Sequence, residues 1–249
     1  MAGSNQVDFI SYYLKKYEEY ADGNLIFGGY GPRFLSWKST NQISNIINLL
    51  QHNPNSRKAV IQLFDSIDIT EPHKDIPCTC VMQFMIRNNS LDMITFMRSN
   101  DVFQGFSHDV FSFTMLQEIL ARTLNVDLGI YKHFVGSLHI YEKDVNAIKQ
   151  FMDEGWQSTE MPMPQMPIGD PWFSIKTLLL AENAIRIDEK VTSIELKDLD
   201  PYWHDLIRLL LIFRYSKNRD YDSIKKTKHE MASLIYSSFI DKRLNDYEG

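Results

Sequence analysis

The sequence contains very little cysteine and no long hydrophobic run. Its 249 residues include two cysteines, Cys78 and Cys80, with one residue between them. That spacing suits neither a structural disulfide nor a self-sufficient zinc site, so we expect a reducing, cytoplasmic setting and no metal centre. No apolar run approaches the roughly 20 residues that cross a bilayer, and the N-terminus lacks a charged start followed by an apolar signal core. We therefore expect a soluble protein that has no membrane partner and is not exported.

Basic charge is also scarce. The chain has 26 lysines and arginines against 32 aspartates and glutamates, which gives a formal net charge of -6. A surface that neutralises the nucleic-acid backbone needs the opposite balance, so no nucleic acid is expected as a partner. A hydrophobic content of 44% is enough for one large core, or for a core with a smaller annex.

Hydrophobic periodicity indicates helices mixed with strands up to residue 168. The spacing predicts helices over 6–20, from Ser39 or Thr40 to 52, over 111–124 and over 142–152. It predicts strands over 59–64, 81–86, 91–96 and 130–140, and residues 88–90 should close the second and third into a hairpin. The glycines of 28–32 fit no phosphate-binding motif and predict a tight turn. A helix buried among strands is typical of an α+β core.

The remainder of the chain is expected to be mostly helical. Residues 161–167 read Met-Pro-Met-Pro-Gln-Met-Pro, and their three prolines exclude a helix, so we place the end of the core at residue 168. In the extension, 169–249, Asp170-Pro171 and Asp200-Pro201 each combine a capping residue with a proline suited to a first helical turn. A further helix is predicted over 221–244.

Five short motifs resemble those of one known family. They are Asn53-Pro54-Asn55-Ser56-Arg57-Lys58, Pro77-Cys78, Gln83-Phe84, Arg98-Ser99-Asn100-Asp101 and Gly136-Ser137-Leu138-His139-Ile140-Tyr141. In this order and with similar gaps they resemble the thymidylate synthase family, whose core shows Asn-Pro-Asp-Ser-Arg-Arg, Pro-Cys-His, Arg-Ser-x-Asp and Gly-x-x-His-x-Tyr. The resemblance covers about residues 17–168 and implies that family's mixed sheet packed with helices.

Cys78 matches the nucleophile of that family. The resemblance implies that its thiolate adds to C6 of a pyrimidine nucleoside monophosphate, after which C5 attacks the methylene carbon of 5,10-methylenetetrahydrofolate. Arg98 matches an arginine near that sulfur and is expected to lower the pKa of the thiol. The alternative is that Cys78 is only a small buried hydrophobic residue.

Four residues match the phosphate-binding positions of the family: Arg57, Lys58, Arg98 and Ser99. Guanidinium groups and a hydroxyl can hold a phosphate dianion from several sides, although Lys58 supplies a point charge where the family usually has an arginine. In the family the paired basic residues come from the second subunit, so the resemblance implies a homodimer with shared active sites. The alternative is that both are ordinary solvated surface charges.

The sugar and the folate have matching positions as well. His139 and Tyr141 match the pair that hydrogen-bonds the sugar 3′-hydroxyl, although a histidine buried in the core is the alternative interpretation. Tyr17 and Tyr20 match aromatic residues beside the folate. Asp101 matches an acidic residue near the folate and the reaction intermediate, where it can assist proton movement.

Asp109 falls where thymidylate synthases have an asparagine that reads uracil. An asparagine amide donates to O4 and accepts from N3–H, whereas a carboxylate accepts from an exocyclic amine and favours a protonated N3, which suits cytosine. The cytidylate hydroxymethylases of the family carry this aspartate and also resemble this chain in Cys78-Thr79, in Arg98-Ser99-Asn100-Asp101 and in the stretch 135–139. The alternative is that Asp109 merely caps a helix that begins at Val110.

The resemblance leaves two interpretations of function. The first is folate-dependent C5 hydroxymethylation of dCMP or CMP, in which water completes the reaction. The second is a catalytically degenerate paralogue that binds a pyrimidine nucleotide as a sensor or as the partner of a complete subunit. The family's N-terminal helix with an essential glutamate has no counterpart that we recognise in this sequence, so the general acid/base is unassigned.

Overall fold

The computed structural model describes residues 2–156, 160, 162–189 and 198–245. The chain separates into two compact units, Met1–Gly155 and Trp156–Gly249. The domain boundary expected at residue 168 stays a prediction.

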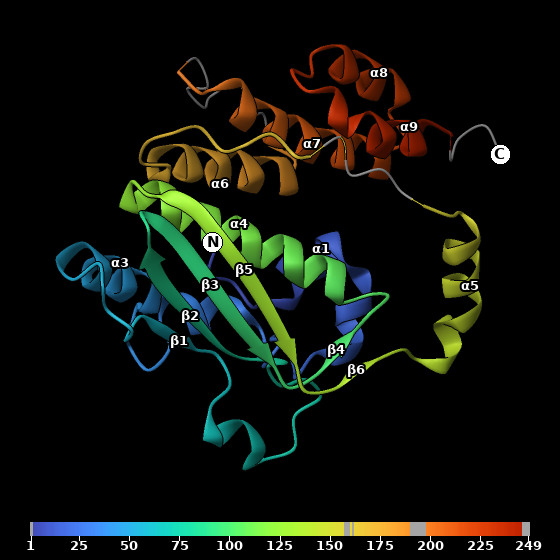
Figure 1. Cartoon of the computed structure of the whole chain (residues 1–249). Helices are drawn as coiled ribbons and strands as arrows, with labels where there is room; N and C mark the ends of the chain where they lie inside the picture. The colour runs from blue at the N-terminus through green and yellow to red at the C-terminus, as the bar shows by residue number, and fades with distance from the viewer. Residues whose placement is uncertain (1, 157–159, 161, 190–197, 246–249) are drawn as a thin grey trace. The chain divides into compact units, whose positions relative to one another are not determined.

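A mixed four-stranded sheet forms the centre of the first unit (Figure 1). Its strands, in spatial order, are β1 (Val60–Gln62), β2 (Thr79–Arg87), β3 (Ser90–Met97) and β5 (Asp127–Val135). The first three are antiparallel, and β5 runs parallel to β3. Asn88 and Asn89 close the predicted hairpin with φ of 49° and 60°, the left-handed conformation that a two-residue hairpin turn needs. The expected α+β fold is confirmed.

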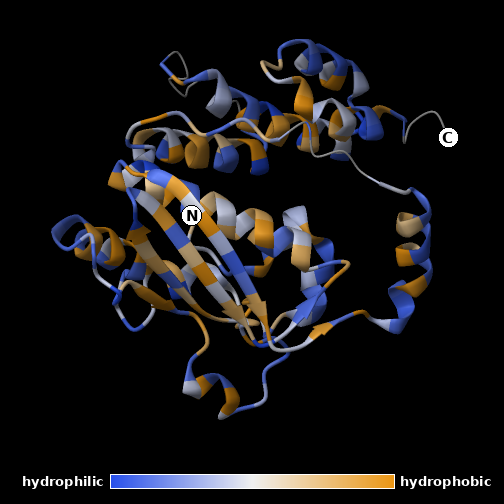
Figure 2. Cartoon of the chain, viewed as in Figure 1, coloured by the Kyte–Doolittle hydropathy of each residue, from blue (hydrophilic) through white to orange (hydrophobic). Residues whose placement is uncertain are grey.

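The two faces of this sheet differ. Along β3 the buried Leu91, Met93 and Met97 alternate with outward residues such as Phe96, which is 43% exposed, and Figure 2 shows this alternation of hydropathy along the strands. Helix α4 (Phe106–Leu124) packs against β3 and β5. Its Gln117 Nε2 donates to the carbonyl oxygen of Leu91 across 2.8 Å. These contacts fix α4 on the buried face of the sheet.

Helix α4 begins at Phe106, five residues before the predicted start. Its N-cap is Gly105, and polar residues follow in the first turn. Polar side chains fit there because the first backbone N–H groups of a helix have no partner within the helix. The helix ends at Asn125, which takes a left-handed φ of 53°. Asp109 therefore lies inside the first turn, and the interpretation of Asp109 as a helix N-cap is wrong.

The strand predicted over 130–140 is interrupted at Gly136. A Cβ at this position would lie 3.1 Å from the carbonyl oxygen of Arg98, which is tighter than an ordinary contact, so glycine suits the close approach of the two chain segments. Beyond the break, β6 (Leu138–His139) pairs in parallel with β4 (Asn100–Asp101) as a separate two-stranded sheet. The chain continues into a short 3-10 helix, η3 (Glu142–Asp144), and α5 (Val145–Asp153).

The N-terminal segment differs from the prediction in detail. The single helix expected over 6–20 is divided at Leu14 into α1 (Val7–Tyr13) and a 3-10 helix, η1 (Lys15–Tyr20). Helix α2 (Tyr30–Leu35) begins inside the predicted glycine turn. Helix α3 (Gln42–His52) is capped by Asn41, which accepts from the Ser44 amide at 2.9 Å, in place of the expected Ser39 or Thr40. A short 3-10 helix, η2 (Ser66–Ile69), follows β1.

The second unit is helical in its described part. It contains α6 (Trp172–Arg186), α7 (Pro201–Lys217), α8 (Tyr221–His229), the 3-10 helix η5 (Leu234–Tyr236) and α9 (Ser237–Asn245). Ile212, Ile224 and Ile240 form its buried cluster. The single helix expected over 221–244 is broken because the amides of residues 232 and 233 bind the buried Asp205 carboxylate at 2.9 and 2.8 Å. Residues 162–167 have no regular structure, as their prolines predict, and Met161 lies outside the described residues.

Candidate functional site

A cavity of about 710 Å³ in the first unit collects most of the predicted site residues. This volume lies within the range of sites that hold small molecules. The predicted residues that line it come from five separate segments of the chain, namely Tyr17, Tyr20, Cys78, Ser99, Asp101, Asp109, His139 and Tyr141.

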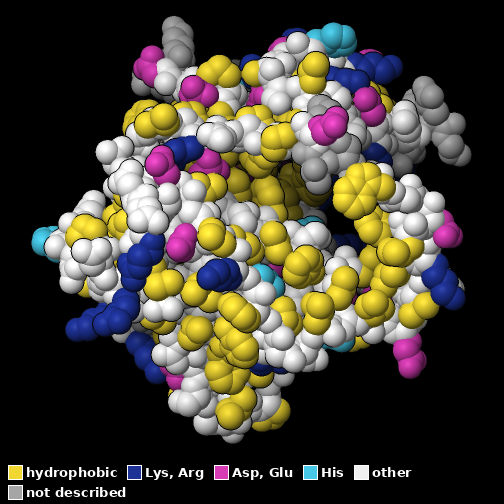
Figure 3. Space-filling view, viewed as in Figure 1, with side chains coloured by type: hydrophobic (Ala, Val, Ile, Leu, Met, Phe, Trp, Pro, Cys, Tyr) yellow, Lys and Arg dark blue, Asp and Glu magenta, His cyan; other side chains and the backbone are white. Residues whose placement is uncertain are grey.

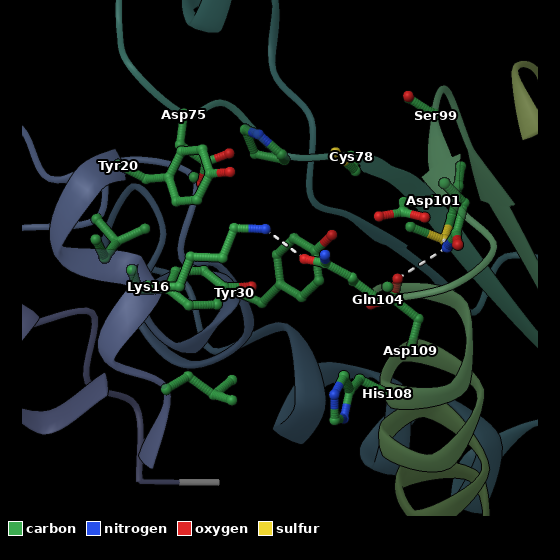
Figure 4. A pocket seen from close by; sticks show the side chains of 18 of the residues that line it. Lys16, Tyr20, Tyr30, Asp75, Cys78, Ser99, Asp101, Gln104, His108 and Asp109 are labelled. Carbon is green, nitrogen blue, oxygen red and sulfur yellow. Dashed lines mark hydrogen bonds between the residues drawn. The ribbon is translucent and has the colours of Figure 1, made fainter. Parts of the chain in front are cut away.

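Backbone pairing brings these segments together. The amide of Arg98, directly after β3, donates to the carbonyl oxygen of Cys78, directly before β2, at 2.8 Å. Three residues after Arg98, Asp101 of β4 pairs with His139 of β6. Figure 4 shows the result, with Cys78, Asp101 and Asp109 on one side of the hollow and Asp75 and Tyr20 on the other.

Cys78 is half-buried, and its sulfur faces a cation. Arg98 Nη2 lies 3.6 Å from Sγ, and its electrostatic effect lowers the pKa of the thiol as predicted. Burial has the larger effect, however, and with the nearby Asp75 and Asp109 carboxylates it raises the pKa of the Cys78 thiol above its ordinary value. The predicted effect of Arg98 on the pKa is therefore confirmed in direction, but it is smaller than the effect of burial. Arg98 itself does not line the cavity and stands exposed at its edge.

Asp109 presents a carboxyl group whose ionisation lies close to neutral pH. Burial raises its pKa to about 6, against the opposite effect of a hydrogen bond from Asn100 Nδ2 at 2.8 Å. Asn100 is almost fully buried, so this donor is fixed in place. The carboxyl can therefore hold or release a proton inside the cavity.

His139 and Tyr141 both reach the cavity. Their rings meet edge to face with centroids 5.0 Å apart. Tyr141 is 51% exposed and His139 is not buried, so the alternative of a core histidine is wrong. Two polar side chains at one accessible edge can hydrogen-bond a hydroxyl group of a ligand.

An apolar wall lies across the cavity from the thiol. Tyr17 and Tyr20 of η1 contribute rings whose centroids are 5.9 Å apart, and Ile10 and Leu14 extend this surface. A planar heterocycle can pack against such a wall. Asp101 also lines the cavity, and its Oδ1 accepts from the Phe103 amide at 2.9 Å.

Arg57 and Lys58 do not line this cavity. Both are exposed in the segment between α3 and β1, where Gln83 Nε2 donates to the carbonyl oxygen of Arg57 at 3.0 Å. Their phosphate-binding role therefore stays a prediction, because within a single chain neither side chain lines the cavity.

The cavity also contains polar residues to which sequence reasoning gave no role. The Tyr30 hydroxyl accepts from the Thr79 amide at 3.1 Å and hydrogen-bonds the Thr79 hydroxyl at 2.9 Å, beside the cysteine, and burial raises its pKa. In the sequence, Tyr30 lies in the glycine-bearing segment 28–32, which indicated only a tight turn. Lys16 and Asp75 lie on the same wall as Tyr20, and no motif marks either of them.

Comparison with known proteins identifies the family. A model of the family described as "Thymidylate synthase" matches residues 3–195, more than three quarters of the chain. The chain belongs to the thymidylate synthase family. The match begins earlier and ends later than the range of about 17–168 expected from the motifs, so it includes α6. Members of the family bind a pyrimidine nucleotide and form dimers.

Individual relatives share 26–30% sequence identity with parts of the chain. The chain is 30% identical over 185 residues to a deoxyuridylate hydroxymethyltransferase of Pseudomonas phage M6, covering 71% of this chain and 53% of that protein. It is 29% identical over 161 residues to a deoxyuridylate hydroxymethyltransferase of Bacillus phage SP01, covering 59% and 42%. A thymidylate synthase of Listeria innocua is 26% identical over 164 residues, covering 64% and 48%. The chain spans about half the length of these relatives.

Two further properties concern the described residues alone. None of their helices is both long enough and apolar enough to cross a membrane. They also contain no group of three or more histidine, cysteine, aspartate or glutamate side chains placed to hold a metal ion.

Proposed function

We propose that this chain carries the site for folate-dependent C5 hydroxymethylation of a cytidine nucleotide, dCMP or CMP. The observation that supports this most directly is that a cysteine and a partly buried aspartate line the same cavity, Cys78 where the family has its nucleophile and Asp109 where the family recognises the base. The family membership supplies the reaction class, and Asp109 supplies the choice of base.

Cys78 begins the chemistry. Its sulfur forms a bond to C6 of the pyrimidine, and the electron pair of the C5–C6 double bond moves towards C5 and the ring substituents, which makes C5 nucleophilic. Arg98, 3.6 Å from the sulfur, stabilises the thiolate that attacks. Because burial opposes this ionisation, the thiolate depends on Arg98 being in place.

In this proposal Asp109 selects cytosine because its carboxylate and N3 of the base can share one proton. One carboxylate oxygen accepts a hydrogen bond from the exocyclic amine of cytosine. The second oxygen faces N3, which also accepts, so a proton on N3 is needed to form the second hydrogen bond. Uracil offers O4 in place of that amine, so an ionised carboxylate repels it. A protonated N3 also withdraws electrons from the ring, which favours addition of the Cys78 sulfur at C6.

Residues of this chain fit the folate that the family uses. The Tyr17 and Tyr20 wall is an apolar, aromatic surface across the cavity from the thiol, and Asp101 lines the opposite side. These are the groups that would hold 5,10-methylenetetrahydrofolate, which supplies a one-carbon unit when it is bound. Asp101 can accept or return a proton at this end of the cavity.

A homodimer completes the phosphate site in this proposal. Arg98 and Ser99 lie at the edge of one chain's cavity, whereas Arg57 and Lys58 are exposed and free to reach into another. The outward face of the sheet, formed by Val81, Phe96, Ile130 and Phe134, exposes large hydrophobic side chains, and Figure 3 shows hydrophobic groups over this part of the surface. An apolar surface of this kind is typical of an interface between subunits.

The names of the two phage relatives favour uracil as the alternative base, since both are deoxyuridylate enzymes. A neutral Asp109 would fit uracil by accepting from N3–H and donating to O4. With the pKa of Asp109 near 6, this form is the minor one at neutral pH. The two bases therefore make opposite demands on the charge of one residue.

Product analysis tests the proposed function. The chain is incubated with methylenetetrahydrofolate and dCMP, CMP or dUMP, and the nucleotides are analysed by mass spectrometry. We expect dCMP or CMP to gain one CH2O unit, and we expect Cys78→Ser to abolish the gain while the matched variant Cys80→Ser retains it. Nucleotide-dependent thermal stabilisation with no product from any nucleotide would instead support the degenerate binding module.

A further inference from the structure

Among the described residues, three carboxyl groups line the cavity: Asp75, Asp101 and Asp109. Two of them are engaged by the protein, because Asp101 accepts from the Phe103 amide and Asp109 accepts from Asn100. Asp75 is half-buried, yet it has no hydrogen-bond or ion-pair partner within the described part of the chain. A partly buried carboxyl without a protein partner is left available to a ligand or to a reacting proton.

The backbone around Asp75 is fixed with respect to the nucleophile. Asp75 precedes Cys78 by three residues, and the carbonyl oxygens of Ile76 and Pro77 accept from Arg98 at 3.1 and 3.0 Å. The same guanidinium lies against the cysteine sulfur. On the other side, a Cβ at Gly28 would lie 2.4 Å from Asp75 Oδ2, so only glycine leaves room for this carboxyl. Figure 4 shows Asp75 across the hollow from Asp109.

The charges that face Asp75 come from several elements. Burial raises the pKa of its carboxyl, the Arg98 and Arg33 guanidinium groups oppose this, and Asp22 adds to it. In return, the Asp75 charge raises the pKa of Cys78 and of Tyr17. The carboxyl, the thiol and the Tyr17 hydroxyl thus share one electrostatic environment.

We propose that Asp75 is the general acid and base of this site, exchanging a proton with C5 of the bound pyrimidine. The inference deepens the proposed function and rests on it for the identity of the substrate. When Cys78 adds to C6, the protonated Asp75 gives its proton to C5 and becomes a carboxylate. In the reverse step the carboxylate removes a proton from C5, the electron pair re-forms the C5–C6 double bond, and the sulfur leaves as a thiolate.

During hydroxymethylation the same carboxylate removes the hydrogen of C5 once that carbon carries the one-carbon unit. A residue in this role needs a pKa closer to neutral than that of an ordinary aspartate, and the burial of Asp75 moves its pKa in that direction. In this role Asp75 takes the place of the catalytic glutamate for which we recognise no counterpart in the sequence.

Exchange of tritium from [5-³H]dCMP tests this role without folate. We expect Asp75→Asn to reduce tritium release by about 100-fold or more, as removal of a general acid/base does. In the same variant we expect alkylation of Cys78 by iodoacetamide to become a few-fold faster, because a negative charge near the thiol has been removed. An unfolded variant would also alkylate faster, because its cysteines would be exposed, so retained nucleotide-dependent thermal stabilisation is the readout that distinguishes catalysis from structure.

Two further variants sharpen the comparison. Asp75→Ser should behave as Asp75→Asn, although its side chain is smaller. Asp22→Asn removes a neighbouring negative charge that does not line the cavity, and it should retain tritium release within about twofold. Nucleotide-dependent thermal stabilisation should be retained in all three.

The outcomes separate this inference from the proposed function. Tritium release that depends on Asp75 supports the inference even if no hydroxymethylated product forms. Tritium release or product formation that Asp75→Asn leaves unchanged overturns the inference while the proposed function stands. Wild-type chain that binds dCMP, CMP and dUMP but releases no tritium from their 5-³H forms also overturns it.

Discussion

Asn100 Nδ2 donates a hydrogen bond to Oδ2 of Asp109 across 2.8 Å. The amide thereby stabilises the ionised carboxyl, whereas burial stabilises the neutral one, and the balance gives a pKa of about 6. Asn100 Oδ1 is buried and has no partner among the described residues, whereas Nδ2 of the same amide donates to Asp109 and to the Met97 sulfur. This pair sets the charge that the cavity offers to a pyrimidine.

Asp109→Asn should change the choice of base. The amide donates where the carboxylate accepts, so the contact with the cytosine amine becomes mismatched and the contact with uracil O4 becomes favourable. We expect relative affinity to shift from dCMP towards dUMP by a few kcal/mol, measured by calorimetric titration of both nucleotides. Unchanged preference would remove Asp109 from the recognition of the base.

Binding of dCMP should take up a proton in a pH-dependent manner. Above pH 6 Asp109 is mostly ionised, so the proton shared with N3 must come from solvent, whereas below pH 6 the carboxyl already carries it. We expect uptake of about one proton per dCMP near pH 7.5 and of almost none near pH 5. Calorimetry in buffers of different ionisation enthalpy measures this number. Equal uptake at both pH values would contradict the shared proton.

The same residue should cost stability at high pH. A carboxyl whose folded pKa is about 6 binds its proton more tightly in the folded than in the unfolded state, so stability rises as pH falls from 7 towards 4. Above pH 6 the buried charge costs roughly 3 kcal/mol at most, because the folded pKa lies about two units above that of an ordinary aspartate. We therefore expect Asp109→Asn to raise the free energy of unfolding in urea near pH 8 by up to that amount, and by much less near pH 4. A variant that is destabilised at pH 8 would show that the carboxylate contributes other contacts.

Mixed dimers should reveal whether the phosphate site is shared. An Arg57→Ala/Lys58→Ala chain retains the cysteine, and a Cys78→Ser chain retains the basic pair, so each is inactive alone. In a mixture with subunit exchange, half the dimers are mixed and one of their two sites is complete, which predicts recovery of about a quarter of wild-type hydroxymethylation. A chain carrying all three substitutions, mixed with either parent, serves as the control and should restore nothing. No recovery despite proven exchange would show that Arg57 and Lys58 do not act in the site of the partner chain.

The sequence was sufficient for the sheet and for most of the cavity. Alternation of apolar residues marked the strands around Phe84 and Met93, and the family motifs marked Cys78, Asp101 and His139, because both kinds of pattern are local in sequence. Helix limits were less accurate where tertiary contacts decide them. The break before α9 depends on amides that bind Asp205, which lies 27 residues away from the nearer one.

The electrostatic properties of the site were not accessible in this way. The arginine beside Cys78 indicated a lowered pKa, but the opposing effect comes from burial and from carboxylates that folding brings close. Asp75 was missed for the same reason, since its significance depends on the space left by Gly28 and on the absence of a partner among the described residues. Neither property is visible in a motif.

Trapping of the covalent adduct tests the central claim most directly. With fluorine at C5, the hydrogen that must leave as a proton is missing, so 5-fluoro-dCMP and methylenetetrahydrofolate should arrest the reaction with the nucleotide bound to the cysteine. Intact-protein and peptide mass spectrometry should locate one adduct per chain on the peptide that contains Cys78, formed faster with 5-fluoro-dCMP than with 5-fluoro-dUMP and not formed by Cys78→Ser. A chain that binds both analogues without any adduct on Cys78, or that reacts only with 5-fluoro-dUMP, would contradict the proposal.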